Sequence, residues 1–186
     1  MRKRLIPLLA LLVLLPSRAA LCQERGGFTL LLTLGYGLQS GGIGEGTSDG
    51  LGGLNLGIGG FVSEDTALMF RISGTNVSYQ YDAMYDQPRI GGSQSMYKED
   101  VVSGVAVFDV QYWPTSRLNL EIGGGFGFVS SDYLYDERGV GLLGAMGYTV
   151  LLRGKYSLQL GVEYAPVVLG GGTINNLGFN VGFQFL

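Results

Sequence analysis

The stretch that decides the fold is NNLGFNVGFQFL, residues 175–186. Every second residue from Leu177 to Phe185 is large and apolar, and the residues between them are Gly, Asn, Gly and Gln. Strict alternation of this kind predicts a β-strand with one apolar and one polar face. A strand whose polar face meets water would usually carry Lys, Glu or Thr there, so amides and bare backbone point to different surroundings.

The same alternation occurs in seven earlier runs of the chain. One parity of the eight runs carries 40 apolar residues, beginning with Phe28 and including Leu152 near the end of the sixth run. The opposite parity is mostly small or polar, and it holds few charges. Eight amphipathic strands with one shared apolar face are therefore predicted.

The connections between the runs alternate in length. Three are tight turns, at residues 63–65, 113–116 and 153–155. Four are longer polar stretches, at residues 39–50, 80–99, 129–139 and 169–174. This rhythm predicts an antiparallel up-and-down sheet that closes on itself, with the longer loops at one end and both termini at the other.

The number of apolar side chains decides which face of the sheet is inside. The interior of an eight-stranded barrel is just wide enough to be filled by side chains or to hold one small ligand. The 40 large apolar side chains do not fit there, whereas the face rich in the chain's 33 glycines does. The sequence therefore predicts an all-β, eight-stranded antiparallel up-and-down transmembrane β-barrel whose apolar face contacts lipid. Tyr112, Trp113 and Tyr156 are expected to form an aromatic girdle at the short-turn end.

Residues 1–22 are predicted to be a cleaved secretory signal peptide, which leaves residues 23–186 as the barrel domain. Basic residues precede an apolar run at residues 5–15, which is shorter than the about 20 residues that a spanning helix needs. Small residues put the cleavage site between Ala19 and Cys22. A retained membrane anchor is the alternative. Cys22 is the only cysteine, so no intrachain disulfide can form.

Charge and composition exclude several function classes. Cleavage after Cys22 would leave 8 Lys and Arg against 15 Asp and Glu, a net charge of −7. Nucleic acid is therefore not an expected partner, because its binding depends on cationic side chains that neutralise phosphates. The chain has no His, so a metal site would consist of carboxylates alone, which suits Ca²⁺ or Mg²⁺ better than Zn²⁺. No metal and no cofactor are expected.

With these features the chain resembles the small bacterial outer-membrane barrels of the OmpA/OmpX type. The signal peptide, the eight runs, the rhythm of short turns and longer loops, and the last amphipathic strand carry the resemblance over residues 27–186. It implies a monomer in the outer membrane of a Gram-negative bacterium, with periplasmic termini and extracellular loops. Its implied partners are outer-membrane lipids, lipopolysaccharide and, during biogenesis, the barrel-assembly machinery. That family usually ends in an aromatic residue, whereas here Leu186 follows Phe185.

The resemblance also bears on catalysis. Outer-membrane enzymes of similar shape, such as lipid A deacylases, palmitoyltransferases and phospholipases, resemble one another in using a His as base or proton carrier. The pKa of His near neutrality suits that role. Since this chain has no His, it is not expected to be an enzyme, and no catalytic residue is assigned.

Four charged residues have the parity of the barrel interior. Arg71, Asp109 and Glu121 fall at nearly the same height on consecutive strands, and Glu163 lies somewhat higher. A buried charge needs a partner, so these residues are predicted to form a closed, structural ion-pair and amide network that plugs the lower lumen. The uncharged residues at the same height are Thr33, Thr149, Gln159 and Asn180. A proton or ion path is the alternative.

The longer loops interleave Tyr with acidic residues. Tyr provides a large amphipathic contact area at low entropic cost, so the loops are a candidate binding surface for a host or cell-surface ligand. The alternative is a hydrated surface whose Tyr side chains lie in the upper interfacial girdle. The candidate residues are Tyr79, Tyr81, Asp82, Tyr85, Asp86, Tyr133, Tyr135 and Asp136.

The leading functional prediction is a non-enzymatic envelope protein that contributes to integrity or to surface adhesion through its loops. The second is a narrow conduit for small apolar compounds, resembling the OmpW group. Val105, Val107 and Leu143 are inward apolar positions compatible with it. The third is a soluble lipocalin-like ligand binder, which the volume argument disfavours.

Overall fold

The computed structural model describes residues 25–41, 47–82, 96–131 and 136–186. Apart from turns and short links, the described chain is β-strand. The strands are β1 (Phe28–Ser40), β2 (Thr47–Ser63), β3 (Thr66–Asp82), β4 (Met96–Tyr112), β5 (Leu118–Ser131), β6 (Asp136–Arg153), β7 (Tyr156–Tyr164), β8 (Val167–Leu169) and β9 (Gly172–Phe185). No helix long and apolar enough to cross a membrane occurs among these residues.

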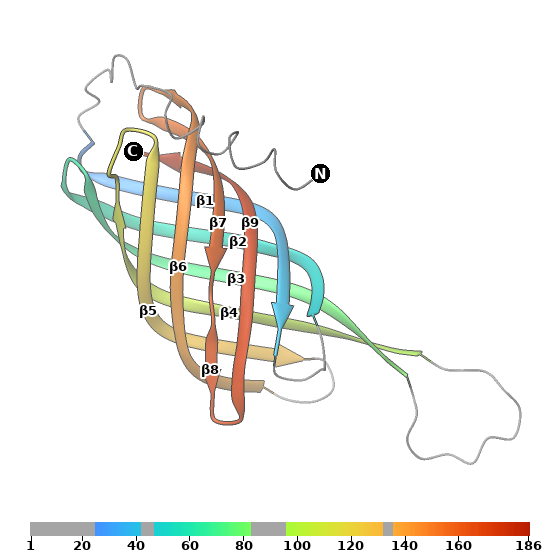
Figure 1. The fold of residues 1–186 in the computed structure, drawn as a ribbon. Coiled ribbons are helices and arrows are strands. Elements are labelled where there is room, and N and C mark those ends of the chain that lie inside the picture. The colour runs from blue at the N-terminus through green and yellow to red at the C-terminus, as the bar shows by residue number, and fades with distance from the viewer. Residues whose placement is uncertain (1–24, 42–46, 83–95, 132–135) are drawn as a thin grey trace, which may run out of the picture.

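From β1 to β7 each strand pairs antiparallel with the next, β7 and β8 both pair with β9, and β9 pairs with β1 to close the ring (Figure 1). β7 and β8 form one interrupted strand, because both pair with β6 on one side and β9 on the other. The interruption falls at Ala165 and Pro166, where Pro has no N–H to donate. Leu142 N donates to Pro166 O at 3.0 Å and Ala165 N donates to Asn176 O at 2.9 Å, so the wall stays closed there. The predicted eight-stranded up-and-down barrel is confirmed.

The apolar face lies outside, as the volume argument requires. Phe108 and Phe126 are 75% and 78% exposed, and apolar side chains of every strand from β1 to β9 share this outer surface. Soluble monomers rarely expose contiguous apolar patches larger than a few hundred Å², and a closed barrel leaves no backbone group unpaired in hydrocarbon. The outer surface therefore suits lipid and not water.

The wall turns a sharp corner at β1. A Cβ added to Gly35 would lie 1.8 Å from the carbonyl oxygen of Phe179 on β9. On the other side of β1, Gly53 of β2 adopts a φ of +60°, next to a register shift between β1 and β2. Glycine supplies both the close backbone approach and the left-handed conformation, and so allows a small barrel to close here.

The strands run further than the sequence predicts at the end that carries the longer loops. The connections leave only residues 41–46, 83–95, 132–135 and 170–171 outside the strands. β3 and β4 pair as far as Asp82 with Met96, whereas β2 and β5 pair with them only up to Val77 and Val101. The upper part of this hairpin therefore projects beyond the rest of the wall (Figure 1).

The lumen is filled by three layers of side chains. The layer at the short-turn end is apolar, with Phe61 and Leu152 packed against buried Leu31, Ala67, Met69, Trp113 and Leu186. A polar layer lies above it. The third layer, toward the longer loops, is apolar and consists of Val77, Tyr79, Val101, Val105, Val107, Val129, Leu143, Ala165, Val167 and Ile174, with Leu169 packed against them.

Two predicted lipid-facing positions are wrong. Trp113 is 3% exposed and lies inside the barrel. The ring centroids of Trp113 and Phe61 are 5.2 Å apart, and the guanidinium carbon of Arg25 lies 4.7 Å from the ring centroid of Trp113. Its parity is that of Asp109, so the alternation of β4 continues into the turn. Leu152 also points inward, because a register shift between Thr149 and Leu151 reverses the parity of β6. Tyr112 and Tyr156 do face outward.

Candidate functional site

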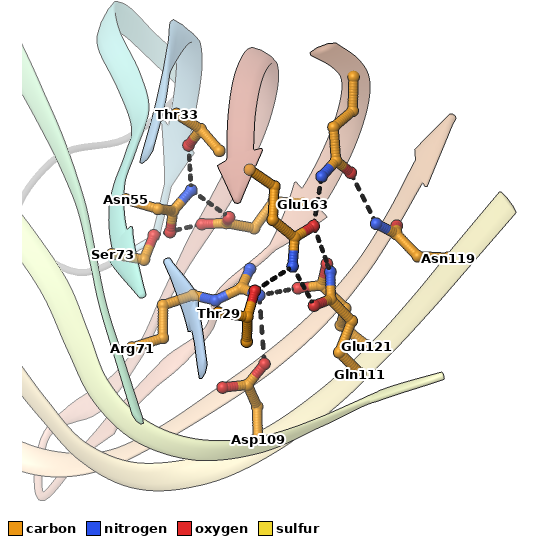
Figure 2. A network of polar contacts seen from close by, with 12 residues as sticks. Thr29, Thr33, Asn55, Arg71, Ser73, Asp109, Gln111, Asn119, Glu121 and Glu163 are labelled. Atoms are coloured by element: carbon orange, nitrogen blue, oxygen red, sulfur yellow. Dashed lines mark hydrogen bonds and ion pairs between the residues drawn. The ribbon is translucent and has the colours of Figure 1, made fainter. Parts of the chain in front are cut away.

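The polar layer is organised around Arg71, which is 2% exposed (Figure 2). Arg71 Nη2 lies 3.2 Å from Asp109 Oδ2 and also forms an ion pair with Glu121 Oε2. The pairing register explains the contact, since Met69 is opposite Asp109 and Gln111 is opposite Glu121. Each charged residue is thus a diagonal neighbour of the next across β3, β4 and β5, a distance that long side chains can bridge.

Glu163 belongs to the same layer but does not contact Arg71 directly. It projects from β7 across the lumen, where Asn55 Nδ2 donates to its Oε2 at 2.7 Å and Ser73 Oγ donates to its Oε1. Asn55 Nδ2 also donates to Thr33 Oγ1 at 2.6 Å. Hydroxyl and amide donors, not a cation, therefore solvate the third carboxylate, and they tie β7 to β1, β2 and β3.

An amide ladder completes the layer on the side of the short turns. Gln111 and Gln184 exchange hydrogen bonds, with Gln184 Nε2 donating to Gln111 Oε1 at 2.7 Å and Gln111 Nε2 donating to Gln184 Oε1 at 3.3 Å. Gln111 Nε2 also donates to Glu121 Oε1 at 2.8 Å, which links the ladder to the ion pairs. Gln159 donates to Gln184 and accepts from Asn119 Nδ2 at 2.6 Å. The hydrogen bonds thus connect β4, β5, β7 and β9 through the lumen (Figure 2).

The open space found in this layer is small. A void of about 20 Å³ is lined by Glu121, Thr33, Gln159 and Asn180, among others. A cavity needs about 10–15 Å³ to hold one water molecule, so this void suits a single molecule and not a file of them. Among the described residues, no group of three or more His, Cys, Asp or Glu side chains is placed to hold a metal ion.

The candidate residues of the loop surface are dispersed. Tyr79 does not belong to it: its ring is 8% exposed and packs in the upper apolar layer, because the inward parity of β3 continues to this residue. Asp136 begins β6 and is exposed. Tyr81 and Asp82 end β3, but their side chains lie outside the described part of the structure, as do the whole residues Tyr85, Asp86, Tyr133 and Tyr135.

No family model and no curated sequence matches the chain. The solved structures give clear matches at low identity. Ail, the attachment invasion locus protein of Yersinia pestis, in complex with the heparin analogue sucrose octasulfate, superposes with a TM-score of 0.53 at 10% identity, over 86% of this chain and 99% of that chain. Neisserial surface protein A superposes with a TM-score of 0.53 at 13% identity, over 86% of this chain and 96% of that chain. The chain has the fold of the small bacterial outer-membrane β-barrels. The predicted resemblance is thereby confirmed at the level of fold.

The sequence predicts amides in this layer, with Gln159 at this height, but it does not predict which hydrogen bonds they form. Asn55, Gln111, Gln159 and Gln184 all have inward parity and are at most 5% exposed. Their number was the available signal, since a buried amide must find partners for both its donor and its acceptor. The partner of Glu163 could not be named in advance, because it depends on which strands face each other across the lumen.

Proposed function

We propose that the protein is a monomeric, non-enzymatic outer-membrane barrel whose loop end contributes to envelope integrity or to surface adhesion. In this proposal residues 1–22 are removed on export and residues 23–186 form the barrel. The termini and short turns lie in the periplasm, and the longer connections face outward. The exposed apolar belt and the fold shared with outer-membrane proteins support the membrane assignment.

The filled lumen is the observation that carries the proposal. Arg71 is fully enclosed between the two apolar layers and paired with two carboxylates. A solute crossing the barrel would have to break buried ion pairs and amide hydrogen bonds, and breaking one buried pair alone costs about 3–5 kcal/mol. Arg71, Asp109, Glu121 and Glu163 are therefore assigned a structural role as a plug, and activity is assigned to the outer end.

The loop end offers a projecting hairpin and acidic charge. Among the described residues, the four pairs from Tyr79–Glu99 to Asp82–Met96 have no neighbouring strand on either side. Asp49, Asp100 and Asp136 are exposed at this end. Such a surface favours a cationic ligand, or divalent cations shared with lipopolysaccharide phosphates. Ail was crystallised with a heparin analogue, but the acidic residues here disfavour a sulfated polyanion, since like charges at a contact oppose binding.

A loop replacement tests the proposal. Residues 83–95 are replaced by Asn-Gly, which joins the paired ends of β3 and β4 with a two-residue hairpin turn. Cells carrying the variant should lose adhesion to host cells or resistance to a detergent–chelator mixture, while the purified barrel keeps its heat-dependent electrophoretic shift. Heparin should not compete with adhesion. Wild-type performance of the variant in both cellular assays would overturn the proposal.

The apolar upper layer favours one alternative, a conduit for small apolar compounds. Val105, Val107 and Leu143 lie there as the sequence predicts, but each is at most 2% exposed because the neighbouring side chains cover it. Uptake of an apolar solute that increases in Val107→Ala, and is unaffected by the loop replacement, would favour the conduit.

A further inference from the structure

The outer surface of the barrel has a groove in its lower half. It shares Met146, Gly147, Gly161, Val162 and Asn180 with the small void of the polar layer, so only the thin wall of the barrel separates the two. The groove has a volume of about 590 Å³ and runs across β5, β6, β7 and β9. Its apolar lining comes from Leu118, Met146, Leu160, Val162, Phe179 and Val181. Gly147 and Gly161 also line it and lie opposite each other on β6 and β7, so bare backbone forms part of its floor.

The upper edge of the groove lies about one membrane leaflet above the lower ends of the strands. Met146 lies seven residues before Arg153 at the lower end of β6, and Val162 lies seven residues after Lys155 at the lower end of β7. With about 3.3 Å per residue and a strand tilt of about 45°, seven residues rise by about 16 Å. Half of the hydrocarbon core is about 15 Å, which is the depth that one acyl chain occupies.

Positive charge lies directly below the groove. Arg117 precedes β5, Arg153 ends β6 and Lys155 precedes β7, and all three are exposed. The turns that carry them, residues 113–117 and 153–155, contain no Asp or Glu. Lys155 Nζ lies over the ring of Phe185, 5.8 Å from its centroid. Among the described residues, no ion pair is formed by Arg117 or Arg153, which leaves these two cations to contact an anionic group.

We propose that this groove binds one anionic phospholipid, with an acyl chain on Gly147 and Gly161 and the phosphate between Arg117 and Arg153. Two features favour a lipid over a protein partner. The groove lies within the apolar belt, where the surrounding medium supplies acyl chains, and its cations lie at the height of the headgroups in the leaflet on the short-turn side. Each Lys or Arg near a membrane surface contributes about 1 kcal/mol to the attraction of anionic lipid, or about five-fold in affinity.

Native mass spectrometry of the full-length folded barrel tests the proposal. The protein is released from micelles that contain equal amounts of phosphatidylglycerol, which is anionic, and phosphatidylethanolamine, which is zwitterionic. The wild type should retain one phosphatidylglycerol molecule in preference to phosphatidylethanolamine. Arg117→Gln combined with Arg153→Gln should reduce that preference by about 25-fold. Arg138→Gln, at the other end of the barrel, is the charge control and should retain the lipid.

Filling the groove tests the acyl-chain contact separately. Leu160→Trp places a bulky ring in the groove and should abolish retention of both lipids. Leu68→Trp is the matched control, because Leu68 on β3 is also 52% exposed but lies outside the groove. Every variant is first checked for the heat-dependent electrophoretic shift of a folded barrel. Equal retention by Leu160→Trp and Leu68→Trp, equal retention of the two lipids by the wild type, or a protein dimer that Leu160→Trp dissociates would each overturn the proposal.

Discussion

Replacing Arg71 by Met should destabilise the barrel more than any other single change in the polar layer. The guanidinium is 2% exposed and is paired with Asp109 and Glu121, so its loss leaves two buried carboxylates without a cation. Breaking a buried pair by removal of one partner costs about 3–5 kcal/mol. With an m-value of about 2 kcal/mol/M in urea, a loss of about 4 kcal/mol lowers the unfolding midpoint by about 2 M.

Trp113 provides the assay, because it is the only tryptophan and is enclosed by the lower apolar layer. Its fluorescence should report unfolding in micelles as urea is added. The matched control is the neutral triple variant Arg71→Met, Asp109→Asn and Glu121→Gln, in which no buried charge is left alone. Its midpoint should recover most of the loss, since replacing a whole buried ion pair is often neutral. A wild-type midpoint for Arg71→Met, or a triple variant as unstable as the single one, would refute the reasoning.

Three further predictions concern the corner at Gly35, the lower apolar layer around Trp113 and the turn that contains Asp65. Gly35→Ala should weaken the closure of the barrel, since overpacking costs about 1–3 kcal/mol and the added carbon would lie 1.8 Å from a backbone oxygen. Gly144→Ala should fold normally, because nothing lies within 4 Å of its added carbon. An equal unfolding temperature of the two variants in the heat-dependent electrophoretic assay would contradict this. Trp113→Ala should lower the free energy of unfolding by about 3–5 kcal/mol, as for other buried aromatic residues. The urea midpoint of unfolding, measured by circular dichroism, should fall accordingly. Tyr112→Ala, on the lipid face, should lower that midpoint less. Hydrogen bonds from the hydroxyls of Ser63 and Thr66 lower the pKa of the Asp65 carboxyl. Its contribution to stability is therefore present above the unfolded carboxyl pKa of about 4 and is lost as the pH falls through the lower folded value. The difference in midpoint between wild type and Asp65→Asn should disappear at the acid end, and a constant difference would count against it.

The alternation in the sequence predicts the fold and the lipid-facing surface, because successive side chains of a strand point to opposite faces of the sheet. It fails where one residue is inserted into the pattern. The register shift between Thr149 and Leu151 turns Leu152 inward, and no residue type in YTVLLR announces it. Trp113 and Tyr79 are different errors, since both keep the inward parity of their strands. Trp113 is predicted at the interface from its residue type, and Tyr79 is predicted in a binding loop. Both predictions are wrong because the backbone continues to alternate wherever the strand continues.

The placement of charge in the lumen follows the same physics. A tight turn precedes β3 and another joins β4 to β5, and Trp113 N donates to Asp65 O, so the two turns lie at one level. Counting residues from these turns brings Arg71, Asp109 and Glu121 to nearly the same height. The height of Glu163 can also be counted, from the turn at residues 153–155, but its partners cannot be named in this way because Asn55 and Ser73 lie across the lumen. Contacts between neighbouring strands can thus be predicted from the sequence. Contacts across the lumen can be predicted only if the cross-section of the barrel is known, and the corner at Gly35 shapes that cross-section. If that corner is what brings β2 and β9 close, Gly35→Ala should disturb the hydrogen bonds of Glu163 before those of Arg71. An order of loss seen in residue-resolved spectra with Arg71 first would contradict that account.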